Sequence, residues 1–285
     1  MSNLEKSPKP VKINFTSYVP RDASSRLPVI FIHGLLDTIA TWDKVMKVIA
    51  DRTKRKVYAL GLRNHAESEW SDEFTLPSLV ADVEEFMKSK AISKANIVGH
   101  SVGGRIAIAL ALYKPEIIEK LVVEDSLVSE PPDDFLEQFL KISKESRKQI
   151  SRLPSCVDET TASDLVSQFV LQCLSKVSNE FSHVPLVLPV KKNRDGKFEF
   201  QVNLEVIEKV IEEKTCHLDL SKAHICTIDT LFIRGEKTVT PTEDKELALQ
   251  YFPNARFHVV KNAGHAVHLD CRQIFTDLLV NFIGK

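Results

Sequence analysis

The sequence predicts an α/β protein in which helices flank a mostly parallel central sheet. Between residues 28 and 126, short apolar β-branched runs alternate with segments whose apolar residues recur at helical spacing. This alternation implies parallel strands joined by right-handed helical crossovers. A G-x-S-x-G stretch at 99–103 lies between a predicted strand and a predicted helix. The alternation stops after Asp125 and resumes near residue 230, which indicates an insertion. A chain of 285 residues can hold one large domain of this kind with an insertion.

The expected elements follow one another in a simple order. Strands are expected at 11–19, 28–32, 56–60, 95–98, 121–124, 230–234 and 255–260, and helices at 41–51, 76–88, 104–112 and the C-terminus. The segment at 11–19 alternates and predicts an outer strand, whereas the apolar run at 28–32 is typical of a central strand. In such sheets ligands bind beyond the carboxyl ends of the strands, so we expect the functional face there.

The insertion is expected to be a helical lid over residues 127–223. A Pro131-Pro132 pair opens it, and it carries three amphipathic patterns, which begin near Phe135, Leu165 and Leu204. Asp195-Gly196 is a tight-turn signal between the second and third patterns. The expected core therefore comprises 11–126 and 224–285. Both flanking strands end at the predicted functional face, so the insertion would cover it and exclude water.

Ser101 is the candidate nucleophile. A serine at a sharp strand-to-helix turn has strained backbone geometry, and Gly99 and Gly103 relieve the crowding that a Cβ would cause there. Its hydroxyl would stand at the start of a helix, where developing negative charge is favoured. Oxyanion donors are expected from the backbone amides of Leu35, in the His33-Gly34-Leu35 exit of the 28–32 strand, and of Val102.

His265 is the candidate general base. It follows a glycine at the end of the 255–260 strand, late in the chain, where an imidazole suits proton transfer near neutral pH. His268, three residues later at the expected start of the terminal helix, competes with it and is interpreted as a supporting or surface residue. His258 and His100 are interpreted as structural, and His65 has no comparable context.

The acid has two candidates. The 230–234 strand is followed by a loop whose acidic residue is Glu236, whereas Asp125 lies at the tip of the strand that precedes the lid. Adjacent strand tips lie roughly 5 Å apart, so an acid at either tip can reach the histidine. We predict Asp125 as the acid and hold Glu236 in reserve. Either choice gives the chain order Ser, acid, His.

Composition excludes several classes of protein. Hydrophobic residues make up 43% and charged residues 27%, and the formal net charge of −1 gives no electrostatic case for binding nucleic acid or an anionic membrane. No run approaches the roughly eighteen apolar residues of a spanning helix. Five scattered cysteines lack metal-type spacing and indicate free thiols in a reducing compartment. Residues 1–10 lack the apolar core of a secretory signal. An intracellular location, cytoplasmic or mitochondrial, is therefore expected; the sequence does not give the oligomeric state.

A family resemblance joins four of these motifs. His33-Gly34-Leu35, Arg63-Asn64-His65, the 99–104 stretch and Asn262-Ala263-Gly264-His265 together resemble the α/β-hydrolase superfamily. Within it they are similar to the branch that contains α/β-hydrolase domain-containing protein 11, described as an sn-1-specific diacylglycerol lipase, and small bacterial esterases. The resemblance spans about residues 11 to 283, including the lid segment around 193–204. It implies the α/β-hydrolase fold, with the lid inserted between the sixth and seventh strands.

The resemblance also bears on the site and on two unusual positions. In the esterase branch the triad acid lies at the strand tip before the lid, which matches Asp125. Ala66 stands where the family usually has glycine after Arg-Asn-His, and Asp37 stands where a glycine is common after His-Gly-Leu-x. Both departures lie near the expected pocket mouth and bear on substrate range.

The expected activity is hydrolysis of carboxylic esters with apolar acyl chains through a Ser101–Asp125–His265 triad and an acyl-enzyme, which needs no metal or cofactor. A thioesterase or a hydrolase of small hormone-like esters would use the same triad, so the sequence does not separate them. A third hypothesis is that the chain is a non-catalytic member of this superfamily that binds a lipid or a protein partner.

Overall fold

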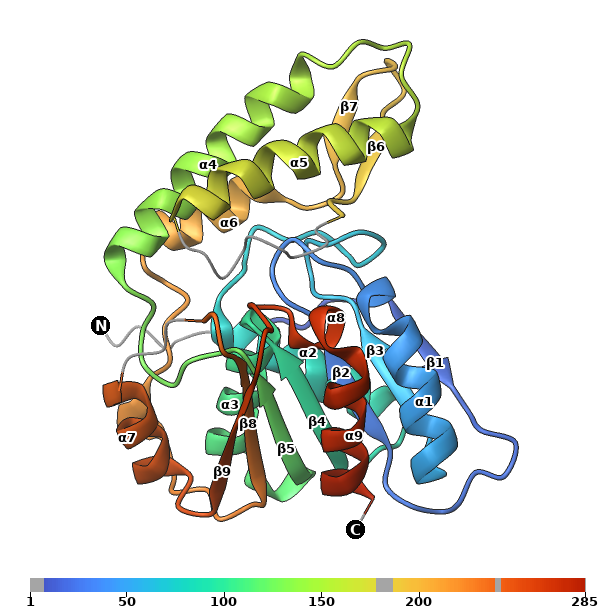
Figure 1. Ribbon diagram of the computed structural model, residues 1–285, viewed down its shortest axis with the longest axis vertical. Helices are drawn as coiled ribbons and strands as arrows, with labels where there is room; N and C mark the ends of the chain where they lie inside the picture. Colours follow the sequence, from blue (N-terminus) through green and yellow to red (C-terminus); the bar gives the residue numbers. More distant parts are fainter. Residues whose placement is uncertain (1–7, 178–186, 239–241, 285) are drawn as a thin grey trace.

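The computed structural model describes residues 8–177, 187–238 and 242–284 (Figure 1). One seven-stranded sheet has the order β1-β3-β2-β4-β5-β8-β9. Its strands are β1 (Phe15–Tyr18), β2 (Val29–Ile32), β3 (Val57–Leu60), β4 (Ala95–His100), β5 (Ile118–Glu124), β8 (Thr230–Gly235) and β9 (Ala255–Val260). The outer strand β1 pairs antiparallel with β3, and the other neighbours pair in parallel. The predicted mostly parallel sheet is therefore confirmed.

Helices cover both faces of the sheet because each central strand is apolar on both sides. In β2, Val29 and Phe31 pack with α1 (Asp43–Thr53) and α9 (Arg272–Ile283). Ile30 and Ile32 pack in a second cluster with α2 (Leu76–Ser89) and α3 (Val102–Tyr113). Further elements around the core are α7 (Thr242–Tyr251), α8 (Val267–Asp270) and the short 3-10 helices Ile39–Trp42, Pro115–Ile117 and Leu220–Lys222.

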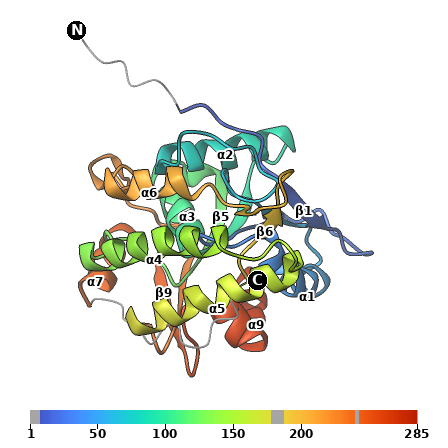
Figure 2. The same cartoon turned by 90° about the horizontal axis from the view of Figure 1, so that it is seen from above.

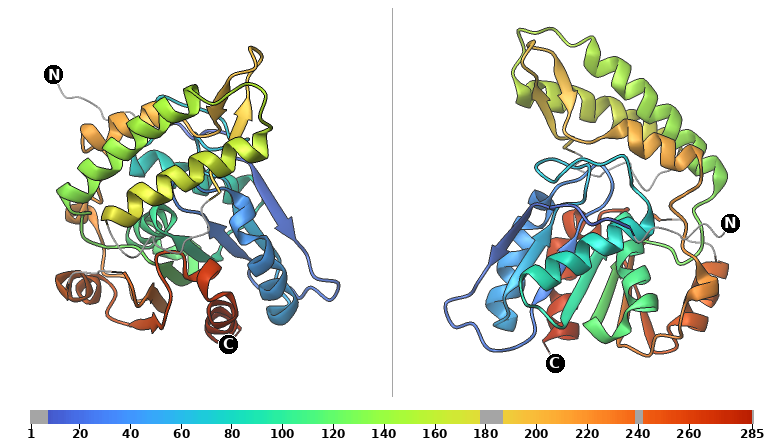
Figure 3. Two further views of the ribbon diagram at one scale, coloured as in Figure 1. Left: turned by 45° about the horizontal axis from the view of Figure 1, so that its top comes forward. Right: turned by 180° about the vertical axis from the view of Figure 1, so that it is seen from behind.

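The segment between β5 and β8 lies over the carboxyl ends of the strands (Figures 1 and 2). It contains α4 (Asp133–Ser151), α5 (Glu159–Val177) and α6 (Leu204–Glu212). It also contains a hairpin of β6 (Val190–Lys192) and β7 (Phe198–Phe200), which the amphipathic patterns did not indicate. The hairpin closes at the Asp195-Gly196 turn, where Gly196 has a left-handed φ of 75°. Figure 3 shows the hairpin beside the N-terminal end of α5, away from α7.

The predicted position of the insertion, between the sixth and seventh strands, is wrong by one strand. The insertion leaves the core after β5, the fifth strand of the sheet in the described part of the chain, and returns at β8, the sixth. The family-type numbering placed it between the sixth and seventh. The difference arises because a single strand, β1, precedes β2 among residues 8–28.

Hydrogen bonds join the insertion to the core at its base and along its underside. The buried Arg105 of α3 donates to Glu130 Oε1 (2.7 Å), which also accepts from the Leu218 amide (3.0 Å), so one ion pair ties the two ends of the insertion together. On the underside, the Asn203 amide donates to the Asn64 carbonyl (2.9 Å). In the described ranges, no helix is long and apolar enough to cross a membrane.

Candidate active site

Ser101 occupies the turn between β4 and α3. Its backbone has φ 53° and ψ −120°, a left-handed conformation that non-glycine residues rarely adopt, and its amide donates to the Glu124 carbonyl (3.0 Å). A Cβ on Gly99 would lie 2.2 Å from the Gly103 carbonyl oxygen, and one on Gly103 would lie 2.3 Å from the Ile32 carbonyl oxygen. Both glycines are therefore required by the close approach of backbone that creates this turn.

A cavity of about 1540 Å³ opens above this turn. Ser101, Val102, Leu35, Asp125 and His265 all line it, so the structure brings every predicted triad and oxyanion residue to one space. The insertion contributes a largely apolar part of the wall, which includes Phe135, Phe139, Ile142, Leu174, Ile207 and Val210. Such a space can hold a long apolar group next to the serine.

Asp125 and His265 lie side by side. Asp125 Oδ1 is 3.4 Å from His265 Nδ1, and Oδ2 accepts from the Gly235 amide (2.9 Å) and the Thr238 hydroxyl (2.8 Å). The Asp125 side chain is 3% exposed. Its contacts with His265, the Gly235 amide and the Thr238 hydroxyl fix the orientation of the carboxylate. The Asp125 φ of 46° turns the chain sharply where β5 ends.

Glu236, the reserve acid, is in a different position. It is exposed, and its Oε2 accepts from the amide of Asn262 (3.0 Å), in the loop that follows β9. Of the two candidate acids, Asp125 is the one whose carboxylate lies within ion-pair distance of His265.

Two buried histidines shape the loop that carries Leu35. His65 Nε2 accepts from the Leu36 amide (3.3 Å), and its Nδ1 donates to the Arg63 carbonyl (2.9 Å). His33 Nε2 accepts from the Leu62 amide (3.1 Å), while its Nδ1 faces the Gly34 carbonyl (2.7 Å). Burial lowers the pKa of His33 to about 3 and that of His65 to about 4, so both are neutral near pH 7.

The left-handed Leu36 (φ 65°) follows Leu35 directly, and its amide is the one that His65 holds. His65 therefore fixes the direction of the predicted oxyanion loop from a neighbouring strand exit. This role of His65 could not be predicted from the sequence, because the hydrogen bond joins residues 29 positions apart.

A second group of buried polar side chains lies next to the candidate triad. The fully buried Glu124 accepts from the His268 amide (2.7 Å) and pairs with His268 Nδ1 (2.8 and 2.9 Å). His100 Nε2 lies 3.1 Å from the His265 carbonyl oxygen. His100 and Glu124 directly precede Ser101 and Asp125, and His268 follows His265 by three positions. Their contacts therefore join the three segments that carry the candidate triad.

His268 is buried and paired, so the interpretation of it as a surface residue is wrong while that of a supporting residue fits. His258 is exposed on β9. A carboxylate next to Asp125 and a histidine three residues after His265 were the signals that could have indicated the pair.

The chain matches a family model described as alpha/beta hydrolase fold over residues 28–270. The chain belongs to the α/β-hydrolase fold family. The resemblance drawn from the sequence motifs is therefore confirmed at the level of the family.

Curated relatives extend this match over the full chain. The chain is 27% identical to the sn-1-specific diacylglycerol lipase ABHD11 of Mus musculus, over 99% of this chain and 88% of the relative. It is 29% identical to the abhydrolase domain-containing protein C22H12.03 of Schizosaccharomyces pombe, over 97% and 99%. Among solved structures, a marine microorganism esterase superposes with a TM-score of 0.74 at 23% identity, covering 95% of this chain and 99% of that one. This similarity supports the same fold.

Proposed function

We propose that this protein is a serine hydrolase of carboxylic esters with apolar acyl chains. Ser101 is the nucleophile, His265 the general base and Asp125 the group that orients and stabilises the imidazole. The amides of Leu35 and Val102 hold the oxyanion. The observation that carries the proposal is the Asp125–His265 pair (3.4 Å) on the same cavity as a serine held in a left-handed turn.

The reaction follows from this arrangement. Ser101 Oγ attacks the ester carbonyl carbon while His265 Nε2 takes its proton, and the tetrahedral oxyanion forms against the two amides. His265 then returns the proton to the leaving alcohol as the C–O bond breaks, which leaves an acyl-serine. Water attacks this ester by the same route and releases the carboxylic acid. Because Asp125 Oδ1 faces Nδ1, the proton remains on Nδ1 and the lone pair on Nε2.

The cavity supports an apolar acyl group as the preferred substrate portion. The insertion lines the cavity with phenylalanine, leucine, isoleucine and valine side chains from α4, α5 and α6. Moving a methylene group from water to such a wall contributes about 0.8 kcal/mol, so each added methylene raises affinity until the cavity is filled. The diacylglycerol lipase name of the relatives fits this class of substrate.

The test is hydrolysis of a p-nitrophenyl ester series, from acetate to palmitate, by the wild type and by Ser101→Ala. We expect activity that rises with chain length and then falls, and a loss of roughly 10⁴-fold or more in kcat for the variant. Full activity of Ser101→Ala would overturn the proposal. If folded wild type hydrolyses no ester, the thioester series is assayed next, and failure there supports a non-catalytic, lipid- or partner-binding member.

Transfer of the acyl group to an alcohol is the second candidate activity. The chain is 24% identical to ethanol acetyltransferase 1 of Wickerhamomyces anomalus over 91% of this chain, which favours this use of the same acyl-enzyme. Ethanol added to the ester assay would then yield ethyl esters, detected by gas chromatography. If no ethyl esters form and hydrolysis is unchanged, water alone deacylates the acyl-enzyme.

We further propose an intracellular location, cytoplasmic or mitochondrial, for this protein. All five cysteines are free thiols, which is typical of a reducing compartment. Fractionation of cells that express a tagged full chain tests this, and recovery of the protein from the culture medium would contradict it.

A further inference from the structure

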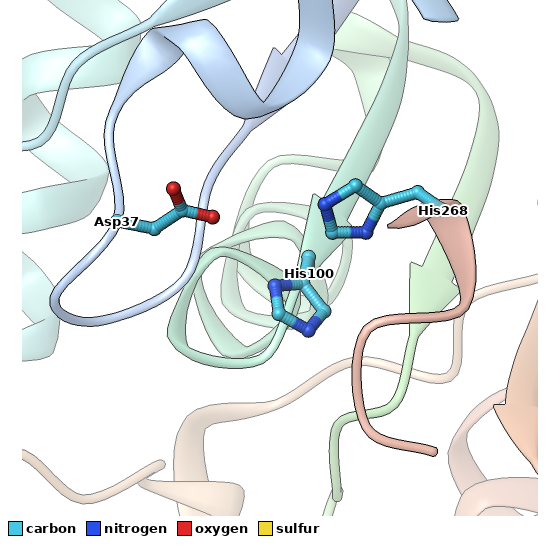
Figure 4. A group of neighbouring side chains, drawn as sticks. All are labelled: Asp37, His100 and His268. Carbon is cyan, nitrogen blue, oxygen red and sulfur yellow. The ribbon is translucent and has the colours of Figure 1, made fainter. Parts of the chain in front are cut away.

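Three side chains that the ester reaction does not use converge beside the cavity. Asp37, His100 and His268 each point one nitrogen or oxygen atom at a common centre (Figure 4), and these atoms lie within 4.8 Å of one another. Asp37 and His100 also line the cavity above Ser101. Asp37 is one of the two positions at which this chain departs from the family's usual glycine, and the proposed triad gives it no role.

Hydrogen bonds on the far side of each imidazole fix which nitrogen carries a lone pair. His268 Nδ1 faces the Glu124 carboxylate (2.8 and 2.9 Å), so it carries the proton and leaves Nε2 as an acceptor. His100 Nε2 faces the His265 carbonyl oxygen (3.1 Å), which can accept only. The proton of neutral His100 is therefore on Nε2, and Nδ1 presents a lone pair.

Among the described residues, the His100 Nδ1 atom of this cluster lacks the hydrogen-bond partner that a buried acceptor needs. It is buried, and it has no hydrogen-bond partner within the described residues. Figure 4 shows this nitrogen on the side of the ring that faces Asp37. A buried acceptor without a partner loses the hydrogen bond that it would make in water, so the arrangement favours a ligand that accepts the lone pair.

We propose that Asp37, His100 Nδ1 and His268 Nε2 bind a divalent transition-metal ion of the zinc or cobalt type. Two imidazoles and a carboxylate are ligands that such ions prefer, whereas calcium and magnesium prefer oxygen alone. Histidines that bind metals donate their other ring N–H to a carboxylate or a backbone carbonyl, and Glu124 and His265 supply those two acceptors here.

Charge at the site agrees with a cation. Asp37 and Glu124 place two carboxylates around the two imidazoles, and the described residues in these contacts include no lysine or arginine. A bound cation would offset the repulsion between these two carboxylates.

Existing hydrogen bonds of both Asp37, which accepts from the Thr38 amide (2.7 Å), and His268 are affected when an ion binds. The Thr41 hydroxyl lies 2.8 Å from His268 Nε2, so it must release that lone pair. Thr41 then lies next to the ion and can supply a neutral oxygen. Ligands at about 2.0–2.2 Å from one zinc lie closer together than 4.8 Å, so the cluster must contract. Asp37 is the member that can move, because it is partly exposed at the cavity wall.

Metal titration of the chelator-treated full chain tests the proposal without any assay of activity. Isothermal titration calorimetry with Zn²⁺, Co²⁺ and Mg²⁺ would be run in a Cys156→Ser background, because this thiol is exposed and could capture zinc. The variants are Asp37→Asn and His268→Gln, with His258→Gln as the matched control at an exposed histidine. Circular dichroism checks that each variant is folded.

We expect one Zn²⁺ or Co²⁺ per chain and little binding of Mg²⁺. Binding should weaken at least ~10-fold in Asp37→Asn and His268→Gln and stay unchanged in His258→Gln. Equal affinity of Asp37→Asn and the wild type, or no stoichiometric binding by the wild type, overturns the proposal and leaves a bound water as the partner of His100 Nδ1. If His268→Gln does not fold, Asp37→Asn decides. Because the readout is binding, its failure is distinct from failure of the ester hydrolase proposal.

Discussion

Replacing His65 with glutamine should reduce the dependence of folding stability on pH. His65 is 1% exposed, and burial lowers its pKa from 6.5 to about 4. Between these values the unfolded chain binds a proton at this residue and the folded chain does not. Stability from this group is therefore fully present above about pH 6.5 and is lost as the pH falls from there toward the folded-state pKa.

The expected magnitude follows from the shift. Each pH unit below 6.5 costs about 1.4 kcal/mol while the folded-state imidazole stays neutral, so about 2 kcal/mol is lost at about pH 5. His33, whose pKa burial lowers to about 3, adds a similar loss. The wild type should therefore lose about 4 kcal/mol from these two groups, and His65→Gln about half of that.

Urea unfolding followed by circular dichroism at about pH 7.5 and about pH 5 measures the difference. Subtracting the two free energies of unfolding within each protein removes the constant cost of the substitution, which includes the weakened contact with the Leu36 amide. His258→Gln, at an exposed position, is the matched control. An identical loss of stability in His65→Gln and the wild type would refute the reasoning.

Three further predictions concern the turn and the acids. Asp125→Asn should lower kcat on the preferred ester by roughly 10⁴-fold while Glu236→Gln stays near wild type, and the reverse pattern would reassign the acid. Glu124→Gln should destabilise the fold by about 3 kcal/mol in urea because it breaks a buried pair with a histidine, and unchanged stability would contradict that role. Gly103→Ala should lower the free energy of unfolding by about 3 kcal/mol, because its Cβ would lie 2.3 Å from a backbone oxygen. Gly196→Ala meets nothing within 4 Å and should lower it by only about 1–2 kcal/mol, because of the left-handed φ at this position. Equal urea midpoints for the two variants would contradict this.

The fold could be predicted because its signals are local. The alternation of apolar runs and amphipathic helices indicates which faces are buried. The 99–103 stretch indicates a sharp turn that few sequences can form. Elements that depend on their own pattern, such as α2 and β4, were expected within a few residues of their observed bounds. The β6–β7 hairpin was missed because its strands are three residues each, too short for a period to be recognised.

The site could be predicted less completely, because its supporting contacts join distant parts of the chain. Asp125 and His265 follow strands, so topology alone suggests that they meet; their roles remain predictions. The Glu124–His268 pair spans 144 positions, and it depends on how β5 and α8 pack rather than on any local pattern. His65 is similar, since a histidine in a polar loop gives no indication that it will be buried against the amide of Leu36.

The most direct test of the central claim is covalent labelling by a fluorophosphonate, followed by mass spectrometry of the intact chain and its peptides. We expect one label per chain, on Ser101, at a rate that falls sharply in His265→Gln because the serine loses its base. Labelling elsewhere, or none in folded wild type, would contradict the assignment of Ser101 as the activated nucleophile.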